Sequence, residues 1–174
     1  MVASRAANSE TFQVSTPTEV DIRMTRLFDA PRQLVFEAMT RPEHVREWWG
    51  RLGEGYSVPV CEIDLRVGGA WRFVNRHPRG EVVFYGEYRE ISPPGRLVFT
   101  EIFAEHPDTV SLVTAELTEE RGKTRATITA RYPSREVRDI VIGSGMEHGA
   151  AISYDRLEDL VIALARGGTA ASVT

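Results

Sequence analysis

The sequence contains a single cysteine, no long apolar run and no excess of positive charge, and each shortage excludes a class of protein. Cys61 alone cannot form an internal disulfide bond or a zinc site built from several thiolates, so we expect a buried, unreactive thiol. No apolar stretch approaches the ~18 residues that cross a bilayer, and residues 1–18 lack the apolar core of a signal peptide. We therefore expect a cytoplasmic protein without membrane insertion.

The charge balance argues against a nucleic-acid partner. Lys and Arg number 21 and Asp and Glu number 25, which gives a formal net charge of −4. A chain without surplus positive charge has little with which to neutralise a phosphate backbone. No two of the four histidines have the i, i+4 spacing of a helical metal site, so neither a metal nor another cofactor is expected.

Length and composition indicate one globular domain. The chain has 174 residues, of which 42% are hydrophobic and 26% charged. The segments 1–18 and 167–174 are rich in small and polar residues, and we expect both to be flexible. The folded unit is therefore predicted to span residues 19–166.

Hydrophobic periodicity predicts a strand, two short helices, six strands and a long helix, in that order. Apolar residues alternate over 20–28. Asp29 is then predicted to be the N-cap of a short helix with Pro31 in its first turn, and a second short helix follows over 43–48. The later strands are expected at 58–65, 70–75, 82–91, 96–103, 110–118 and 124–132, separated by turns rich in Gly and Pro. Such short connections join antiparallel neighbours.

The C-terminal segment should cover one face of this sheet. Ser134 is placed to cap an amphipathic helix of up to about thirty residues, which is long enough to cross a whole sheet. The fold class is therefore α+β, with helices on one face of an antiparallel sheet. Gly145, Gly149, Ala150 and Ala151 leave little side-chain volume in the middle of the helix, which indicates either close packing or a kink, or else room for a ligand.

Several segments, in order along nearly the whole folded unit, resemble a known family. They are 28–38 (FDAPRQLVFEA), 42–50 (PEHVREWWG), 62–71 (EIDLRVGGAW) with 86–99 (GEYREISPPGRLVF), and 144–149 (SGMEHG) leading into 153–157 (SYDRL). The chain resembles the activator-of-Hsp90-ATPase-like (AHSA1) branch of the START-like, or SRPBCC, superfamily. The resemblance implies a helix-grip fold of the START-like or Bet v1-like kind, with about seven curved antiparallel strands around the long helix. It also implies a cavity between sheet and helix that holds a small hydrophobic molecule.

We expect that cavity to be lined mainly by aromatic residues, with Trp48 and Trp49 at its entrance. Any one of the aromatic residues could equally fill the core. The predicted ligand-binding residues are Trp48, Trp49, Trp71, Phe73, Phe84, Tyr88, Phe99, Glu101, Met146, Gly149 and Tyr154.

Three functions remain open at this stage. The leading prediction is binding of a hydrophobic or amphipathic small molecule, such as a lipid, without covalent chemistry. The first alternative is a cyclase, dehydratase or hydrolase acting on a polyketide-like substrate, which needs an inward acid–base pair supplied by Asp64, Arg66, Glu101 or His148. Charged residues near 62–66 could instead form structural ion pairs. The second alternative is a co-chaperone-like interaction module; a chaperone partner is not expected, whereas exposed strand edges and the Trp pair could support a homodimer.

Overall fold

The computed structural model of the chain describes residues 11–167. The elements in chain order are β1 (Phe12–Ser15), β2 (Asp21–Phe28), α1 (Arg32–Thr40), α2 (Pro42–Trp48), β3 (Ser57–Ile63), β4 (Ala70–His77), β5 (Gly80–Ser92), β6 (Arg96–Phe103), β7 (Val110–Glu120), β8 (Lys123–Arg131), α3 (Arg135–Gly143) and α4 (Met146–Gly167).

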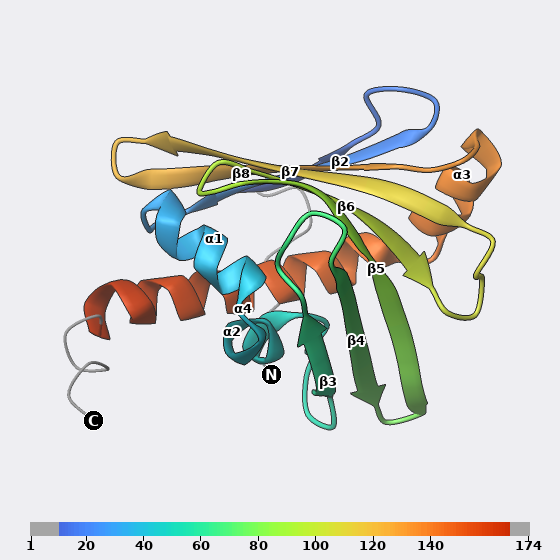
Figure 1. Cartoon of the computed structure of the whole chain (residues 1–174), viewed down its shortest axis with the longest axis horizontal. Helices are drawn as coiled ribbons and strands as arrows, with labels where there is room; N and C mark the ends of the chain where they lie inside the picture. The colour runs from blue at the N-terminus through green and yellow to red at the C-terminus, as the bar shows by residue number, and fades with distance from the viewer. Residues whose placement is uncertain (1–10, 168–174) are drawn as a thin grey trace.

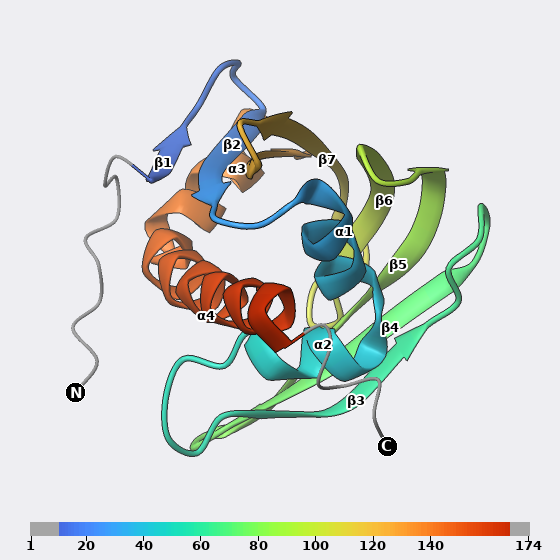
Figure 2. The ribbon, with the colours of Figure 1, turned by 90° about the vertical axis from the view of Figure 1, so that its left-hand side faces the viewer.

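All the strands join one antiparallel sheet, which curves around the long helix α4. The eight strands lie in the order β1-β2-β8-β7-β6-β5-β4-β3. Figure 1 shows α4 running along the inner side of the sheet, and Figure 2, which looks along α4, shows the strands bending around it with α1 and α2 on the same side. The predicted α+β class and helix-grip fold are thus confirmed.

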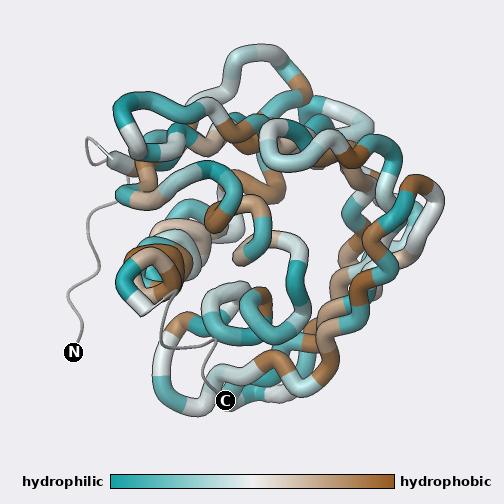
Figure 3. Tube along the Cα trace, turned by 60° about the vertical axis from the view of Figure 1, so that its left-hand side comes forward, coloured by the Kyte–Doolittle hydropathy of each residue, from teal (hydrophilic) through white to brown (hydrophobic). Residues whose placement is uncertain are grey.

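Alternation along the strands explains why only one face is covered. In β8, Ala126, Ile128 and Ala130 are buried, while the residues between them are partly exposed. Figure 3 shows the same alternation of hydrophobic and hydrophilic residues along the sheet. A period of two places every second side chain on the face that packs against the helices.

The sheet has one strand more than predicted. Strand β1 pairs with β2 in a register that joins Phe12 to Arg26 and Ser15 to Arg23, within a segment expected to be flexible. The ring of Phe12 is only 1% exposed. This strand is too short for a recognisable alternation, and its burial depends on tertiary packing. Of the predicted flexible ends, 1–18 and 167–174, residues 1–10 and 168–174 lie outside the described residues.

The predicted continuous C-terminal helix is wrong, because the structure contains two helices. Ser134 does cap α3, since its Oγ accepts a hydrogen bond of 3.2 Å from the N–H of Val137. Gly145, however, has a φ of +81° and separates α3 from α4. This left-handed conformation ends a helix, and glycine adopts it without steric cost.

The helical corner formed by α1 and α2 begins later than the sequence indicates. The prediction that Asp29 caps the first helix is wrong, since Pro31 occupies the N-cap and no side chain caps this end. The N–H of Asp29 instead donates to a carboxylate oxygen of Glu158 on α4, 3.2 Å away. In residues 11–167, no helix is both long enough and apolar enough to span a membrane.

Candidate functional site

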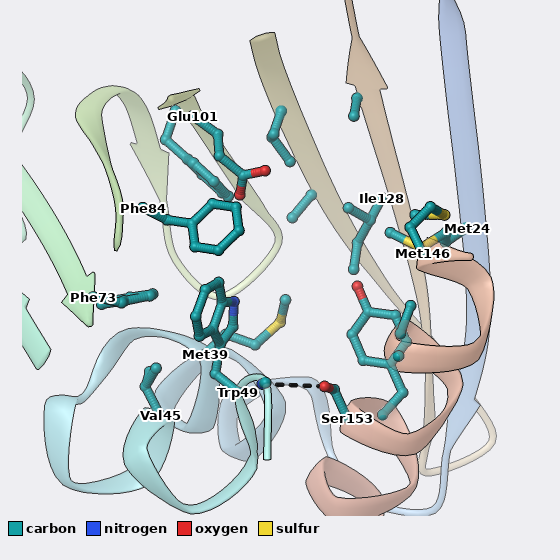
Figure 4. Close-up of a pocket in the computed structure, with 18 of the residues that line it drawn as sticks. Met24, Met39, Val45, Trp49, Phe73, Phe84, Glu101, Ile128, Met146 and Ser153 are labelled. Atoms are coloured by element: carbon teal, nitrogen blue, oxygen red, sulfur yellow. Dashed lines mark hydrogen bonds between the residues drawn. The ribbon is translucent and has the colours of Figure 1, made fainter. Parts of the chain in front are cut away.

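A cavity of about 370 Å³ lies between α4, the helical corner and the inner face of the sheet (Figure 4). This volume falls in the range of ~300–1,000 Å³ that is typical of small-molecule sites. The sheet contributes alternate residues of six strands, which share one face because of the two-residue period. These residues are Ile22 and Met24 (β2), Ile128 and Ala130 (β8), Val113 and Ala115 (β7), Leu97, Phe99 and Glu101 (β6), Phe84 and Tyr88 (β5), and Trp71, Phe73 and Asn75 (β4).

One wall of the cavity is a chain of aromatic rings. The ring of Trp49, just after α2, has its centroid 5.1 Å from that of Phe73 and 5.1 Å from that of Phe84, both in edge-on geometry. The ring of Trp71 continues the chain, at 4.8 Å from Phe73 and 5.6 Å from Phe99. Such ring pairs stabilise each other beyond their burial, so this wall is preformed.

The two neighbouring tryptophans have different roles. Trp48 is 6% exposed, and its Nε1 donates a buried hydrogen bond of 2.9 Å to the carbonyl oxygen of Ala38. Trp49 is half-buried and presents its ring to the cavity (Figure 4). Both tryptophans line the cavity, as expected for residues near its entrance, but Trp48 is buried and only Trp49 is partly exposed.

The four small residues at 145 and 149–151 have different positions relative to the cavity. Gly149 and Ala150 line the cavity, and a Cβ added at Gly149 would meet only the Leu52 side chain, at an ordinary contact distance of 3.5 Å. Gly145 instead forms the break before α4, and Ala151 is buried at 3% exposure outside the cavity wall. Both interpretations of this segment, the kink and the empty volume, thus apply to different residues.

Two hydrogen bonds, here called the clamp at Gly50, hold the loop after α2 at the edge of the cavity. The Nδ2 of Asn75 donates to the carbonyl oxygen of Gly50 at 3.0 Å, and the Gly50 N–H donates to Ser153 Oγ at 3.1 Å. Gly50 has a φ of +63°, which suits glycine. The loop is thereby tied to the sheet and to α4 at one point. Sequence reasoning missed Asn75 and Ser153, although both occupy inward positions of their elements.

Glu101 is the one carboxyl group among the described residues of the cavity wall. It follows Leu97 and Phe99 on the inner face of β6, and its carboxyl points into the cavity (Figure 4). Burial raises the pKa of Glu101 from 4.5 to about 7 because the charged carboxylate is deprived of hydration inside the cavity wall. Near neutral pH the cavity therefore holds a carboxyl that is partly protonated and partly charged.

Three phenols accompany Glu101 in the wall. Burial raises the pKa values of Tyr88, Tyr132 and Tyr154, and the negative charge of Glu101 raises those of Tyr132 and Tyr154 further. All three hydroxyls are consequently neutral at physiological pH. They can donate or accept hydrogen bonds from a polar group of a ligand.

The structure brings all eleven predicted ligand-binding residues into the wall of this one cavity. It does not bring the other predicted acid–base residues there. Asp64 and Arg66 form an exposed ion pair of 2.8 Å in the loop after β3, and His148 is exposed on α4. An acid–base pair made from these residues with Glu101 is therefore not assembled.

Neither the cysteine nor a metal cluster adds chemistry to the site. Cys61 is 4% exposed, and burial raises the pKa of its thiol to about 11, so it is not a thiolate at neutral pH. Among residues 11–167, no three His, Cys, Asp or Glu side chains are grouped in a way that could hold a metal ion.

Comparison with known proteins identifies the family of this chain. The family model described as "Activator of Hsp90 ATPase homolog 1-like protein" matches residues 29–161. Among curated proteins, none matches the chain.

Solved structures of bacterial proteins share the architecture. A protein of Rhodobacter sphaeroides is similar at 26% identity with a TM-score of 0.80, over 88% of this chain and 99% of that one. A protein of Nitrosomonas europaea is similar at 27% identity and a TM-score of 0.72, over 84% and 97% of the two chains. A Chromobacterium violaceum protein matches at 26% identity and a TM-score of 0.70, over 82% and 97%. The chain therefore belongs to the AHSA1-like family of the SRPBCC, or Bet v1-like, superfamily, whose fold is that of a ligand-binding domain.

Proposed function

We propose that this protein binds a small, largely apolar molecule in the cavity between α4 and the sheet. The observation that carries the proposal is an unfilled volume of about 370 Å³ whose wall consists mostly of aromatic, aliphatic and methionine side chains. An empty apolar volume of this size forfeits packing contacts, and a ligand of matching shape would restore them.

The proposal is confined to binding, without a reaction. The catalytic alternative requires an acid–base pair whose members both titrate near neutral pH in reach of one substrate. Glu101 is joined in the described cavity wall by phenols whose pKa values are raised, and by no histidine or second carboxyl. No observation favours a catalytic function over simple binding.

The test uses the neutral probe N-phenyl-1-naphthylamine, whose fluorescence increases in apolar surroundings. We expect saturable binding by the purified protein and displacement by other apolar molecules. The variant Ala115→Phe should weaken binding at least tenfold, because Ala115 lines the cavity. Its matched control is Thr114→Phe, at the next residue of β7, which lies on the outer face and should leave binding unchanged.

A second filling variant guards against loss of folding. Gly149→Leu places a good helix former in α4 where only Leu52 lies nearby, so it should fold while reducing the cavity volume. Absence of saturable binding by the unmodified protein, or equal binding by both filled variants and the control, would contradict the proposal.

A further inference from the structure

The carboxyl group of Glu101 has no counter-charge in the cavity. Among the described residues of the cavity wall, none carries an amine, a guanidinium or an imidazole group. No hydrogen bond or ion pair reaches this carboxyl from any described residue, and burial is the one cause of its raised pKa. Buried charges in proteins are normally paired, so an unpaired carboxyl facing an empty volume indicates that its partner comes from outside the chain.

The aromatic side chains around Glu101 favour a positively charged partner. Phe99 precedes it by two residues on the same face of β6, and Figure 4 shows the ring of Phe84 beside its carboxyl. The face of an aromatic ring is negative and attracts cations. The ring chain through Trp49, Phe73 and Phe84 continues along the same wall. A carboxylate surrounded by aromatic rings therefore favours a positive group and disfavours an anion.

We propose that the ligand of this cavity is an apolar molecule with one ammonium group, which pairs with the Glu101 carboxylate while its hydrocarbon part packs against the aromatic wall. This inference rests on the proposed binding function and adds the chemical class of the ligand. The charge of Glu101 raises the pKa values of Tyr132 and Tyr154, so both hydroxyls lie within its electrostatic range. These hydroxyls can accept hydrogen bonds from the remaining ammonium protons.

The pairing predicts a pH dependence of affinity. The groups that face Glu101 are Tyr132, which follows β8, Tyr154 of α4 and the uncharged rings of the neighbouring strands. Since both phenols stay neutral, Glu101 is the group whose charge changes between pH 6 and 8, with a pKa of about 7. Affinity for an amine that stays protonated should therefore rise over this range, whereas affinity for a neutral molecule should not.

Three ligands that share one skeleton test the inference: 1-naphthylmethylamine, 1-naphthalenemethanol and 1-naphthoic acid. Calorimetric titration at pH 8 should show the amine binding about tenfold more tightly than the alcohol, as for one hydrogen bond to a charged group, and the acid most weakly. Glu101→Gln should abolish the tenfold preference for the amine. The control Glu62→Gln removes an exposed charge from β3 and should retain it.

The outcomes separate this inference from the proposed function. If the amine and the alcohol bind the unmodified protein equally, the apolar site stands and the amine class is wrong. A preference for the amine that persists in Glu101→Gln also overturns the inference, because the pairing then lies elsewhere. If none of the three ligands and no neutral probe binds, the proposed function itself falls, and the inference with it.

Discussion

The indole Nε1 of Trp71 donates a hydrogen bond to the carbonyl oxygen of Thr100, 3.0 Å away, across Gly86 of the intervening strand. Trp71 is paired directly with Gly86 in the β4–β5 ladder. A Cβ at Gly86 would overlap the Thr100 carbonyl oxygen and lie 2.8 Å from the indole nitrogen. The glycine thus leaves room for the indole of Trp71 to reach across β5 to Thr100, which fixes one end of the aromatic wall.

We predict that Gly86→Ala lowers the free energy of unfolding by about 2–4 kcal/mol, because the new methyl group displaces the β6 backbone and the indole bond. Urea denaturation measures this change. Gly53→Ala is the matched control, since a Cβ there meets no atom within 4 Å. Equal stabilities of the two variants would show that the close approach at Gly86 is unimportant.

Glu101 should make the stability of the fold depend on pH. The native state keeps a proton on Glu101 up to a pKa of about 7, whereas the unfolded chain loses it near 4.5. The native state therefore binds more protons in this window, and stability falls as the pH rises from 4.5 to 7. The loss amounts to at most about 3 kcal/mol above pH 7, from a shift of 7 − 4.5 = 2.5.

Glu101→Gln should remove this loss, so its advantage over the unmodified protein should be near zero at pH 4 and largest at pH 8. Urea unfolding at pH 4, 6 and 8 measures the difference. Glu62→Gln, which removes an exposed negative charge, should show no such trend. If the free energies of unfolding of Glu101→Gln and of the unmodified protein changed with pH in parallel, the carboxyl would be solvated in the folded state.

The break between α3 and α4 gives a second matched pair of glycines. A methyl group added at Gly143 or at Gly145 would meet no atom within 4 Å, but only Gly145 has a positive φ, of +81°. We expect Gly145→Ala to lower the free energy of unfolding by about 1 kcal/mol through backbone strain. Gly143→Ala, at the end of α3, should leave the free energy of unfolding unchanged or raise it. Thermal unfolding of both variants decides this, and a cost at Gly143 alone would contradict the explanation.

The sequence predicted the inner face of the sheet well because alternation is a local property. Once Phe99 is assigned to the inner face of its strand, Leu97 and Glu101 follow. The same rule places Trp71 with Phe73 in β4, and Phe84 with Tyr88 in β5. The family resemblance supplied the helix that faces them. Residues that line the cavity were therefore accessible without coordinates.

Features that depend on contacts between distant segments were not accessible. The clamp at Gly50 joins Asn75 and Ser153, which are separated by 78 positions (153 − 75) and carry no shared motif. Arg26 lies on the inner face of β2 beside hydrophobic residues, and the sequence alone offers no reason for a charge there. Its partner, Asp155, is 129 residues away on α4.

The ion pair between Arg26 of β2 and Asp155 of α4 should stabilise the packing of α4 against the sheet. Its Nη1–Oδ1 distance is 2.7 Å, and the Arg26 side chain is 2% exposed. We predict that Arg26→Ala lowers the free energy of unfolding by about 3 kcal/mol, because it removes a buried side chain together with its ion pair to Asp155. The control is the Asp64–Arg66 pair, which is as short at 2.8 Å but has side chains 52% and 70% exposed. Arg66→Ala should change stability by less than about 0.5 kcal/mol, since solvent screens the pair. Denaturant unfolding of both variants measures the two losses of stability. Equal losses would contradict the prediction, because the length of the ion pair rather than its burial would then determine how much it stabilises the fold.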